Sequence, residues 1–446
     1  VINKLPAPPQ GFGLDLSRSQ ITDEELIELN GLTQLQSLSL RGTRVTDAGL
    51  KNLAGLNQLL SLDLFNNRVT DLGLKELSGL KQLQNLGLSG TQVTDAGMKE
   101  LDNLTQLQSL NLHGRVTDAG MKKLAGLTQL RRLNLEFCPV TDLGLKELAS
   151  LYQLEALFLS NSRVTDAGLK NLSSLKQMQT LELNFVHVTD EGLKDLSSLK
   201  QLQSLSLYHA QVTDAGLREL AGLTQLQTLY LSGTEVTDEG LKELAELRQL
   251  QTLGLTYTPV TGAGLKALTG LTQLQTLELS GSPVTDAGMK GLAGLTQLTS
   301  LELRETRVTD IGLKELAGLK QLQALDLYGS RVTDAGMKEL AGLYQLQTLL
   351  LHDTQVADAG LKELAGLSQL QTLALGDNVT DAGLKELSGL KQLRNLQLGE
   401  KVTDAGLKEL AGMQQLQTLT IYSRQVTKAG AENLRKALAH CEIYRL

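Results

Sequence analysis

The phrase Val-Thr-Asp, or a near copy of it, occurs eighteen times along this chain of 446 residues. The first copy begins at Ile21 and the last at Val426. Successive copies lie 24 residues apart, except for three steps of 23 that end at Val116, Val379 and Val402. A fixed period of this length is the signature of a solenoid, in which each repeat is one small structural unit stacked on its neighbours. Repetition therefore constrains the fold more than any other feature of the sequence.

Composition and cysteine spacing exclude several classes of protein. The formal charge is -7, and no basic block interrupts the repeats, so we expect no nucleic-acid partner. Apolar residues never run for the roughly 18 positions that a membrane-spanning helix needs, so no membrane insertion is expected. Cys138 and Cys441 lie twelve repeats apart. At about 5 Å per strand they are separated by about 60 Å, whereas a disulfide needs Cα atoms within about 7 Å. We therefore predict no intramolecular disulfide.

The first half of a repeat, illustrated by residues 35–45, predicts a short strand followed by a turn. Leu38 and Leu40 alternate with polar residues, which is the period of a strand with one buried face. Gly42 and Thr43 then turn the chain, and Val45 returns to the core.

The second half of the repeat predicts a short helix. Thr46 suits the N-cap position, and Asp47 lies in the first turn, where the helix dipole favours negative charge. Leu50 and Leu53 share one helical face. Gly55 is expected to end the helix with a positive φ.

Stacking these units predicts an α/β solenoid. Strands of successive repeats should lie side by side in parallel, and the stack should curve because helices are bulkier than strands. The expected shape is an arc or horseshoe of about 18 repeats of 23–24 residues, with a concave parallel β-sheet and short helices on the convex side. We predict an N-terminal linker or cap at 1–13, the array at 14–427, and a C-terminal capping helix (429–439) and last strand at 428–446. Terminal repeats need such polar cover.

The motif LxxLxLxxTxVTDxGLxxL, carried by every repeat between about 14 and 446, resembles the leucine-rich repeat family. It is most similar to the ribonuclease-inhibitor-like and cysteine-containing classes, and to bacterial, planctomycete-type arrays rich in VTDAGLKELAGL. One departure is that the cysteine-containing class places Cys after the strand, where this chain mostly has Thr or Ser. Only Cys138 keeps it. The resemblance implies the same curved solenoid.

Comparison of the repeats within the chain separates a constant surface from a variable one. The pair Lys-Glu recurs on the helix face, whereas the outward strand positions change in almost every repeat. Exposed aromatic residues dominate the energy of protein interfaces. Six aromatic residues in six consecutive repeats occupy the outward strand positions or the two residues after them, and with His209 at the edge they form a candidate protein-binding patch: Phe137, Phe158, Phe185, Tyr208, Tyr230 and Tyr257. The alternative interpretation is neutral drift after duplication.

A second candidate site is a row of acidic residues. Glu278, Glu302 and Asp326 occupy the same outward position in three consecutive repeats. Like charges opposed across strands destabilise a sheet, although Arg304 can relieve part of this repulsion. Either the row binds a basic segment of a partner, or it is a solvated face whose repulsion water screens.

The two short repeats near the C-terminal end are not expected to form part of a binding surface. The 23-residue steps ending at Val379 and Val402 shorten the turn after the strand and place Gly376 and Gly399 beside the sheet. Because glycine has no side chain, we expect this end to offer little contact chemistry.

No motif in the chain indicates catalysis. The sequence contains no phosphate-binding loop, no Cys/His cluster at metal spacing and no nucleophile with a recognisable base, so we predict no catalytic residue, cofactor or metal. The predicted function is a non-enzymatic, monomeric scaffold that recognises a protein partner on its concave face. The alternatives are a structural or spacer solenoid without a ligand, an engineered consensus-like array and, last, an enzyme. The sequence names neither the partner nor the compartment.

Overall fold

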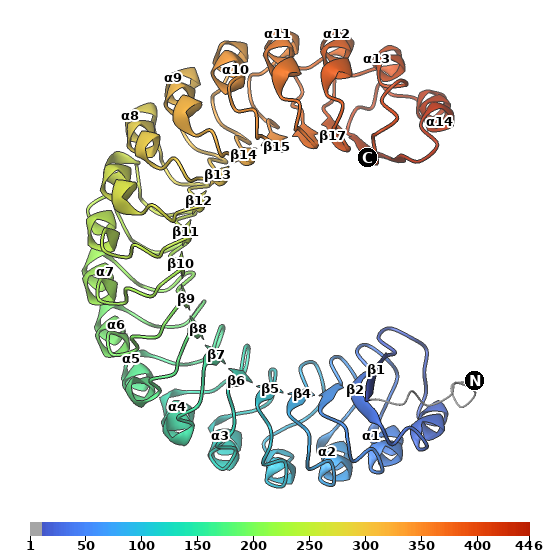
Figure 1. Ribbon diagram of the computed structural model, residues 1–446, viewed down its shortest axis with the longest axis vertical. Helices are drawn as coiled ribbons and strands as arrows, with labels where there is room; N and C mark the ends of the chain where they lie inside the picture. Colours follow the sequence, from blue (N-terminus) through green and yellow to red (C-terminus); the bar gives the residue numbers. More distant parts are fainter. Residues whose placement is uncertain (1–10) are drawn as a thin grey trace. The chain divides into compact units, whose positions relative to one another are not determined.

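The computed structural model describes residues 11–446, so the prolines of the expected N-terminal linker, at positions 6, 8 and 9, lie outside the described residues. The chain divides into two units, Val1–Val212 and Thr213–Leu446, which are described separately. Within each unit the stack of repeats bends, with strands on the inner side and helices on the outer side (Figure 1). The predicted α/β solenoid with a parallel sheet and short helices is confirmed in both units.

In the first unit, the strands of residues 11–212 pair in parallel, each with the next along the chain. They are β1 (Phe12–Asp15), β2 (Leu35–Ser39), β3 (Ser61–Asp63), β4 (Asn85–Gly87), β5 (Ser109–Asn111), β6 (Arg132–Asn134), β7 (Ala156–Phe158), β8 (Thr180–Glu182) and β9 (Ser204–Ser206). The α-helices are α1 (Asp47–Leu50), α2 (Asp71–Leu77), α3 (Asp118–Leu124), α4 (Asp142–Glu147), α5 (Asp166–Leu169) and α6 (Asp190–Leu196). Short 3₁₀ helices are η2 (Glu25–Leu29), η3 (Lys51–Leu53), η4 (Met98–Leu101), η5 (Leu148–Ser150) and η6 (Lys170–Ser174).

The second unit repeats the same arrangement, again with each strand parallel to the next. Its strands are β10 (Thr228–Tyr230), β11 (Thr252–Gly254), β12 (Thr276–Glu278), β13 (Ser300–Glu302), β14 (Ala324–Asp326), β15 (Thr348–Leu350), β16 (Thr372–Ala374), β17 (Asn395–Leu398), β18 (Thr418–Ile421) and β19 (Glu442–Arg445). Its α-helices are α7 (Asp214–Leu220), α8 (Asp286–Met289), α9 (Asp310–Leu313), α10 (Asp334–Leu340), α11 (Asp358–Leu361), α12 (Asp381–Leu384), α13 (Asp404–Glu409) and α14 (Lys428–Ala437). Its 3₁₀ helices are η7 (Gly240–Leu244), η8 (Ala263–Gly270), η9 (Lys290–Gly294), η10 (Lys314–Gly318), η11 (Lys362–Gly366) and η12 (Lys385–Gly389).

The core is a stack of leucine layers. Leu38, Leu40, Val45 and Leu50 are each 0% exposed, as the alternation of the repeat predicts. Equivalent leucines pair in register, so Leu38 lies opposite the corresponding leucine of β3. Because every repeat adds one such layer, the apolar core grows along the stack rather than around a centre.

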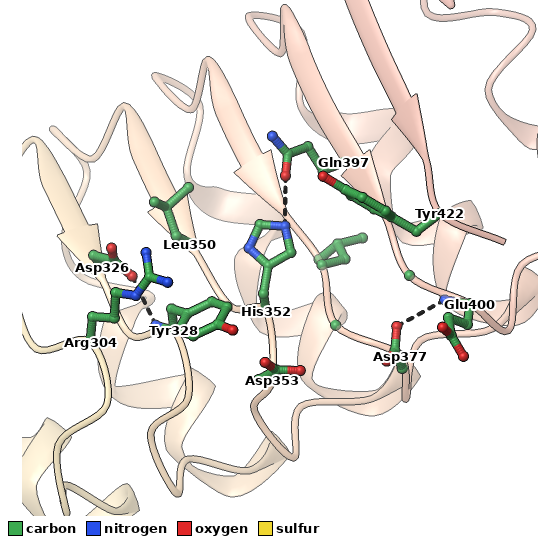
Figure 2. Close-up of a pocket in the computed structure, with 13 residues that line it drawn as sticks. Arg304, Asp326, Tyr328, Leu350, His352, Asp353, Asp377, Gln397, Glu400 and Tyr422 are labelled. Atoms are coloured by element: carbon green, nitrogen blue, oxygen red, sulfur yellow. Dashed lines mark hydrogen bonds between the residues drawn. The ribbon is translucent and has the colours of Figure 1, made fainter. Parts of the chain in front are cut away.

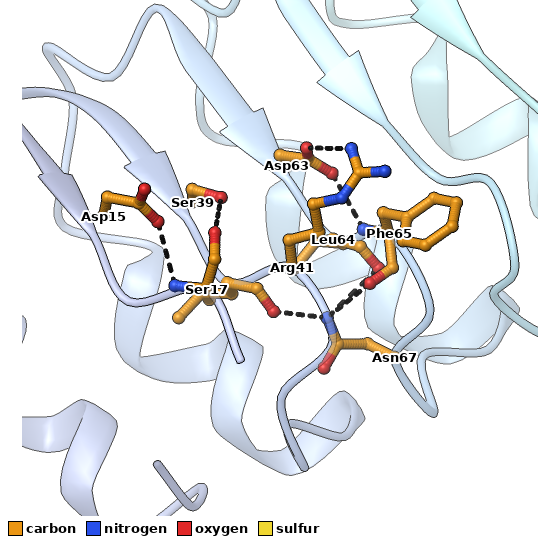
Figure 3. Close-up of polar contacts among 9 residues, drawn as sticks. Asp15, Ser17, Ser39, Arg41, Asp63, Leu64, Phe65 and Asn67 are labelled. Atoms are coloured by element: carbon orange, nitrogen blue, oxygen red, sulfur yellow. Dashed lines mark hydrogen bonds and ion pairs between the residues drawn. The ribbon is translucent and has the colours of Figure 1, made fainter. Parts of the chain in front are cut away.

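Polar side chains close the turn after many of the strands. The hydroxyl of Thr43 donates to the carbonyl oxygen of Leu40 at 2.8 Å. The side-chain amide of Asn67 donates to the carbonyl oxygen of Leu40 at 2.7 Å and to that of Leu64 at 3.1 Å (Figure 3). Cys138 stands at the same position and is buried. Burial raises the pKa of its thiol to about 11, so it acts as a packing residue and not as a nucleophile. Both cysteines are free, as predicted.

The repeated Val-Thr-Asp-x-Gly phrase links each repeat to the next. One carboxylate oxygen of Asp118 accepts the backbone N–H of Thr141 at 2.8 Å, and the other accepts the Thr141 hydroxyl at 2.7 Å. The N–H of Gly144 donates to the same carboxylate at 3.1 Å. Thr141 also caps α4, as the predicted N-cap role requires. Asp118 therefore has a second role besides its favourable interaction with the dipole of α3, because its carboxylate also binds the N-terminal residues of α4 in the next repeat.

The two ends of the array carry their own helices. At the start, the 3₁₀ helix η2 begins at Glu25. The capping helix, expected at 429–439, is α14, which begins at Lys428 because Thr427 caps it by accepting the N–H of Gly430. Ile443 in β19 is 7% exposed and closes the last core layer.

The prediction that Gly55 ends its helix with a positive φ is wrong. Among residues 11–446, the glycines with positive φ lie in turns on the other side of the helix or at its start, such as Gly42 at 64°. The repeat leaves its helix through the 3₁₀ turn η3, and the following Ala54 keeps a right-handed φ of -57°. The i→i+3 bonds of such a turn satisfy the last carbonyls without a left-handed residue.

Candidate functional site

One backbone position shapes the candidate aromatic surface. It lies two residues after the second strand leucine and adopts a left-handed conformation in most repeats. Glycine, asparagine or aspartate tolerates this conformation and occupies the position at Gly42, Asn66, Gly90, Gly114, Asn161, Gly233, Gly281, Gly329 and Asp353. The same position holds Phe137 at φ 60°, Phe185 at 56°, His209 at 55° and Tyr257 at 56°. It also holds two charged residues, Arg18 at 57° and Glu305 at 56°. A bulky residue there costs roughly 1–2 kcal/mol relative to glycine.

The aromatic residues at this position are also exposed to water. Phe137 is 53% exposed, Phe185 is 50% exposed and Tyr257 is 56% exposed. Water contact with an apolar ring is itself unfavourable. Each of these residues therefore lowers the stability of the fold in two ways, through its left-handed backbone and through the exposure of its ring to water.

In the first unit, ring contacts divide the predicted aromatic residues into two clusters. The rings of Phe185, Tyr208 and His209 form one cluster, with centroids 5.0 Å apart from Phe185 to each partner and 4.5 Å apart between Tyr208 and His209. Phe137 instead pairs with His113 at 5.0 Å. His113 was not among the candidate residues, although it lies in the same stretch after the second strand leucine.

Phe158 lies between these clusters in the order of the strands. It ends β7, where it pairs in register with Asn134 of β6 and Glu182 of β8. The guanidinium of Arg132 lies 5.1 Å from the centre of its ring. The strand face of the first unit therefore combines aromatic rings with flanking polar groups.

In the second unit, two predicted tyrosines lie over glycines. Tyr230 ends β10, and a Cβ atom added to Gly254 would come within 2.6 Å of its ring. A Cβ atom added to Gly281 would clash with the ring of Tyr257. These glycines leave the space that the two rings occupy beside the neighbouring repeat.

The acidic row forms a continuous ladder in the second unit. Glu278 pairs in register with Glu302, and Glu302 pairs with Asp326. Burial raises the pKa of all three carboxyl groups, and the neighbouring carboxylate raises it further for both glutamates. Arg304 lowers the pKa of Glu302 and Asp326, while its guanidinium also lies 4.0 Å from the ring of Tyr328.

These raised pKa values predict that the ladder destabilises the fold at neutral pH. A carboxyl group whose pKa is higher in the folded state favours folding when protonated, and this contribution is lost as the pH rises through the folded pKa. We expect the triple variant Glu278→Gln, Glu302→Gln, Asp326→Asn to be more stable than the parent at pH 7 by about 1 kcal/mol. Urea denaturation at pH 7 and pH 4 should show this difference shrinking in acid.

A matched control carries the same charge change on the helix side: Glu315→Gln, Glu339→Gln and Glu363→Gln. This variant should show no comparable gain at pH 7. An acidic-ladder variant that is less stable than the parent at pH 7 would contradict the assignment of mutual repulsion.

The expectation that the C-terminal end offers little contact chemistry is wrong. The glycines of the two short repeats help to line a hollow of about 400 Å³, into which side chains from the surrounding repeats project (Figure 2). Its lining comprises Arg304, Asp326, Tyr328, Leu350, His352, Asp353, Leu375, Gly376, Asp377, Gln397, Gly399, Glu400 and Tyr422. Because Gly376 and Gly399 have no side chains, they leave the space of the hollow, and side chains of other residues line it.

Hydrogen bonds hold several walls of this hollow. Nε2 of His352 donates to Oε1 of Gln397 at 2.7 Å, and Oδ1 of Asp377 accepts the backbone N–H of Glu400 at 2.9 Å (Figure 2). A hydrogen bond to Asp353 raises the pKa of the Tyr328 hydroxyl. The sequence carried no local signal for this arrangement, since the residues that line the hollow come from six repeats.

Among residues 11–446, no group of three or more His, Cys, Asp or Glu side chains is placed to hold a metal ion. Each helix in that range is too short or too polar to cross a bilayer.

The comparisons with known proteins identify the family. A model described as a leucine-rich repeat region matches residues 62–283 and 273–444, and a second leucine-rich repeat model matches residues 31–54. The chain belongs to the leucine-rich repeat family. No curated protein matches it.

Solved structures share the fold. An internalin from Listeria monocytogenes is 27% identical, with a TM-score of 0.55 over 79% of this chain and 88% of that chain. The plant peptide hormone receptor RGFR1, in complex with RGF2, is 15% identical, with a TM-score of 0.51 over 98% of this chain and 80% of that chain. The Arabidopsis receptor kinase HAESA ectodomain, in complex with an IDA peptide hormone, is 18% identical, with a TM-score of 0.51 over 93% and 74%. The two plant receptors show similarity of fold alone.

Proposed function

We propose that this chain is a non-enzymatic, monomeric scaffold that binds a protein partner on the strand face of its repeats. The binding residues are the aromatic ones predicted from the sequence. They are Phe137, Phe158, Phe185 and Tyr208 in the first unit, with His209 at their edge, and Tyr230 and Tyr257 in the second unit. The observation that carries the proposal is the left-handed, exposed placement of Phe137, Phe185 and Tyr257.

Neutral drift accounts poorly for these residues. Drift at a free position should favour residues that fold without penalty, as glycine, asparagine and aspartate do at the same position of other repeats. Aromatic residues there lower stability unless another benefit compensates. Burial of exposed rings in an interface supplies such a benefit, because aromatic anchors commonly dominate binding energy.

The rival interpretations explain less. A spacer solenoid without a ligand provides no reason to place apolar rings in strained, exposed turns. An idealised consensus array would use glycine or asparagine at this position throughout. The same fold holds peptide hormones in RGFR1 and HAESA, which supports a binding role for such a surface. The choice of binding residues rests on this chain alone.

The test replaces one ring without disturbing its turn. Phe185→Asn introduces the residue that stands at the equivalent position as Asn66 and Asn161. After affinity capture identifies a partner, its affinity for the variant should fall about thirtyfold, since an anchor residue is worth about 2 kcal/mol. Isothermal titration calorimetry measures this change. The unfolding free energy should be unchanged or higher, because Asn tolerates the left-handed backbone.

The control is Lys146→Ala with Glu147→Ala in α4 of the same unit, which should leave affinity unchanged. Capture of a protein does not by itself show that it binds the aromatic surface, since only the variants locate its binding site. If the helix-face control weakens binding and Phe185→Asn does not, the partner uses the helix side and the proposed surface is wrong.

A further inference from the structure

The hollow in the second unit has the chemistry of a site for a cation. Four carboxylates line it, from Asp326, Asp353, Asp377 and Glu400, against one guanidinium from Arg304. That guanidinium is already engaged, because it lies 3.6 Å from the carboxylate of Glu305 and 4.0 Å from the ring of Tyr328. The remaining negative charge favours a positively charged ligand group.

The walls of the hollow also suit the aliphatic stem of such a group. Leu350 contributes apolar surface, and Tyr422, which is 42% exposed, contributes a ring on the side of the later repeats (Figure 2). Lysine and arginine side chains combine an apolar stem with a charged head. Aromatic faces also attract cations. An acidic rim around apolar walls therefore matches a lysine or arginine side chain better than a free metal ion.

The hollow is continuous with the acidic ladder. Asp326 belongs to both, since it is the last acid of the ladder and lines the hollow. The next residue in register is Leu350, so the row changes from acidic to apolar at the edge of the hollow. Ladder steps of about 4.8 Å and the roughly 6.6 Å spacing of alternate residues in an extended chain allow successive basic side chains to reach this row.

We propose that the hollow receives a lysine or arginine side chain from an extended basic segment of the protein partner, with further basic residues of that segment over Glu302 and Glu278. This inference rests on the proposed protein-binding function and adds the chemistry of the partner. It also explains why three like charges persist in register on one sheet despite their mutual repulsion.

The probe is a fluorescein-labelled nine-residue peptide of alternating lysine and alanine, measured by fluorescence anisotropy with the full chain. The hollow variant is Asp326→Asn, Asp377→Asn, Glu400→Gln, which keeps the acceptor oxygens that bind the backbone N–H groups of Tyr328 and Glu400. We expect at least a tenfold loss of affinity for this variant. The helix-side variant Glu315→Gln, Glu339→Gln, Glu363→Gln has the same net charge and should lose less than twofold.

A second pair of variants tests the hollow without any change of charge. Tyr422→Ala should weaken peptide binding severalfold, whereas Tyr344→Ala, which removes a tyrosine that is 62% exposed, should not. A peptide with glutamine in place of lysine should not bind. Equal losses of peptide affinity in the two charge variants would mean that only long-range attraction holds the peptide, and this would overturn the proposal. Full peptide affinity in Tyr422→Ala would also overturn it.

These outcomes are independent of the aromatic surface. If the lysine peptide shows no preference for the hollow while Phe185→Asn still weakens the captured partner, this inference fails and the proposed function stands. If Phe185→Asn has no effect while the hollow variants weaken the peptide, the binding function remains and its aromatic location is wrong.

Discussion

Leu349→Ala should lower the free energy of unfolding by about 2–5 kcal/mol, whereas Leu350→Ala should lower it by about 1 kcal/mol or less. The two leucines are adjacent in β15 and differ only in the side of the sheet to which they point. Leu349 is 0% exposed within the leucine core, while Leu350 lies on the strand face and lines the hollow. Removal of the first side chain leaves a cavity in a packed layer, which neighbouring repeats fill only partly.

Urea denaturation followed by circular dichroism measures both changes, provided that the slope of free energy against urea is the same for the variants. The identical substitution at neighbouring positions removes differences in residue type and helix or strand propensity. Equal losses for the two variants would mean that the assignment of buried and outward strand positions is incorrect, and the candidate surface would then have no basis.

The features that depend on local periodicity were predictable from the sequence. Alternating leucines predict which strand residues are buried, and Leu38 and Leu40 are both inaccessible to solvent. A threonine before most of the α-helices predicts the N-cap, and Thr46 accepts the backbone N–H of Ala48. These properties follow from the strand and helix periods and from hydrogen-bonding chemistry within a few residues. Stacking then repeats them along the array.

The left-handed turn after most of the strands could have been recognised in the sequence, although the prediction did not include it. Alignment of the repeats places glycine, asparagine and aspartate at one position, and this composition indicates a left-handed backbone. Phe137 and Phe185 stand in the same column. Their exposure was predicted from the strand pattern, whereas their strain follows only when the column is recognised as a turn that favours glycine.

The hollow could not be predicted from any single repeat. Gly376 and Gly399 alone suggest a surface without side chains. The space becomes a lined hollow because His352 and Tyr422, from other repeats, project beside it together with Gln397 of β17. Such an arrangement depends on the direction of side chains across several strands, which the period of the sequence does not encode.

Contacts between repeats also explain why glycine follows the Val-Thr-Asp phrase by two residues in every repeat but the first. A Cβ atom added to Gly144 would lie 2.5 Å from Oδ1 of Asp118 and 2.7 Å from Cγ1 of Val140. Similar close approaches occur at Gly73 against Asp47 and at Gly336 against Asp310. Glycine is required here by space between repeats, since φ at these positions is not left-handed.

We therefore expect Gly144→Ala to destabilise the fold by about 3 kcal/mol. Overpacking costs about 1–3 kcal/mol, and displacement of the Asp118 carboxylate also weakens its hydrogen bonds to Thr141, which as charge-assisted bonds contribute about 1.5–3 kcal/mol each. The control is Gly126→Ala, where no atom lies within 4 Å of the added Cβ. That variant should be neutral or stabilise the fold by up to about 1 kcal/mol, because alanine restricts the unfolded chain. Thermal or urea denaturation of both variants measures the difference. A Gly144→Ala protein as stable as the Gly126→Ala protein would show that the carboxylate shifts without loss, and the repeated phrase would then need an explanation other than contact between neighbouring repeats.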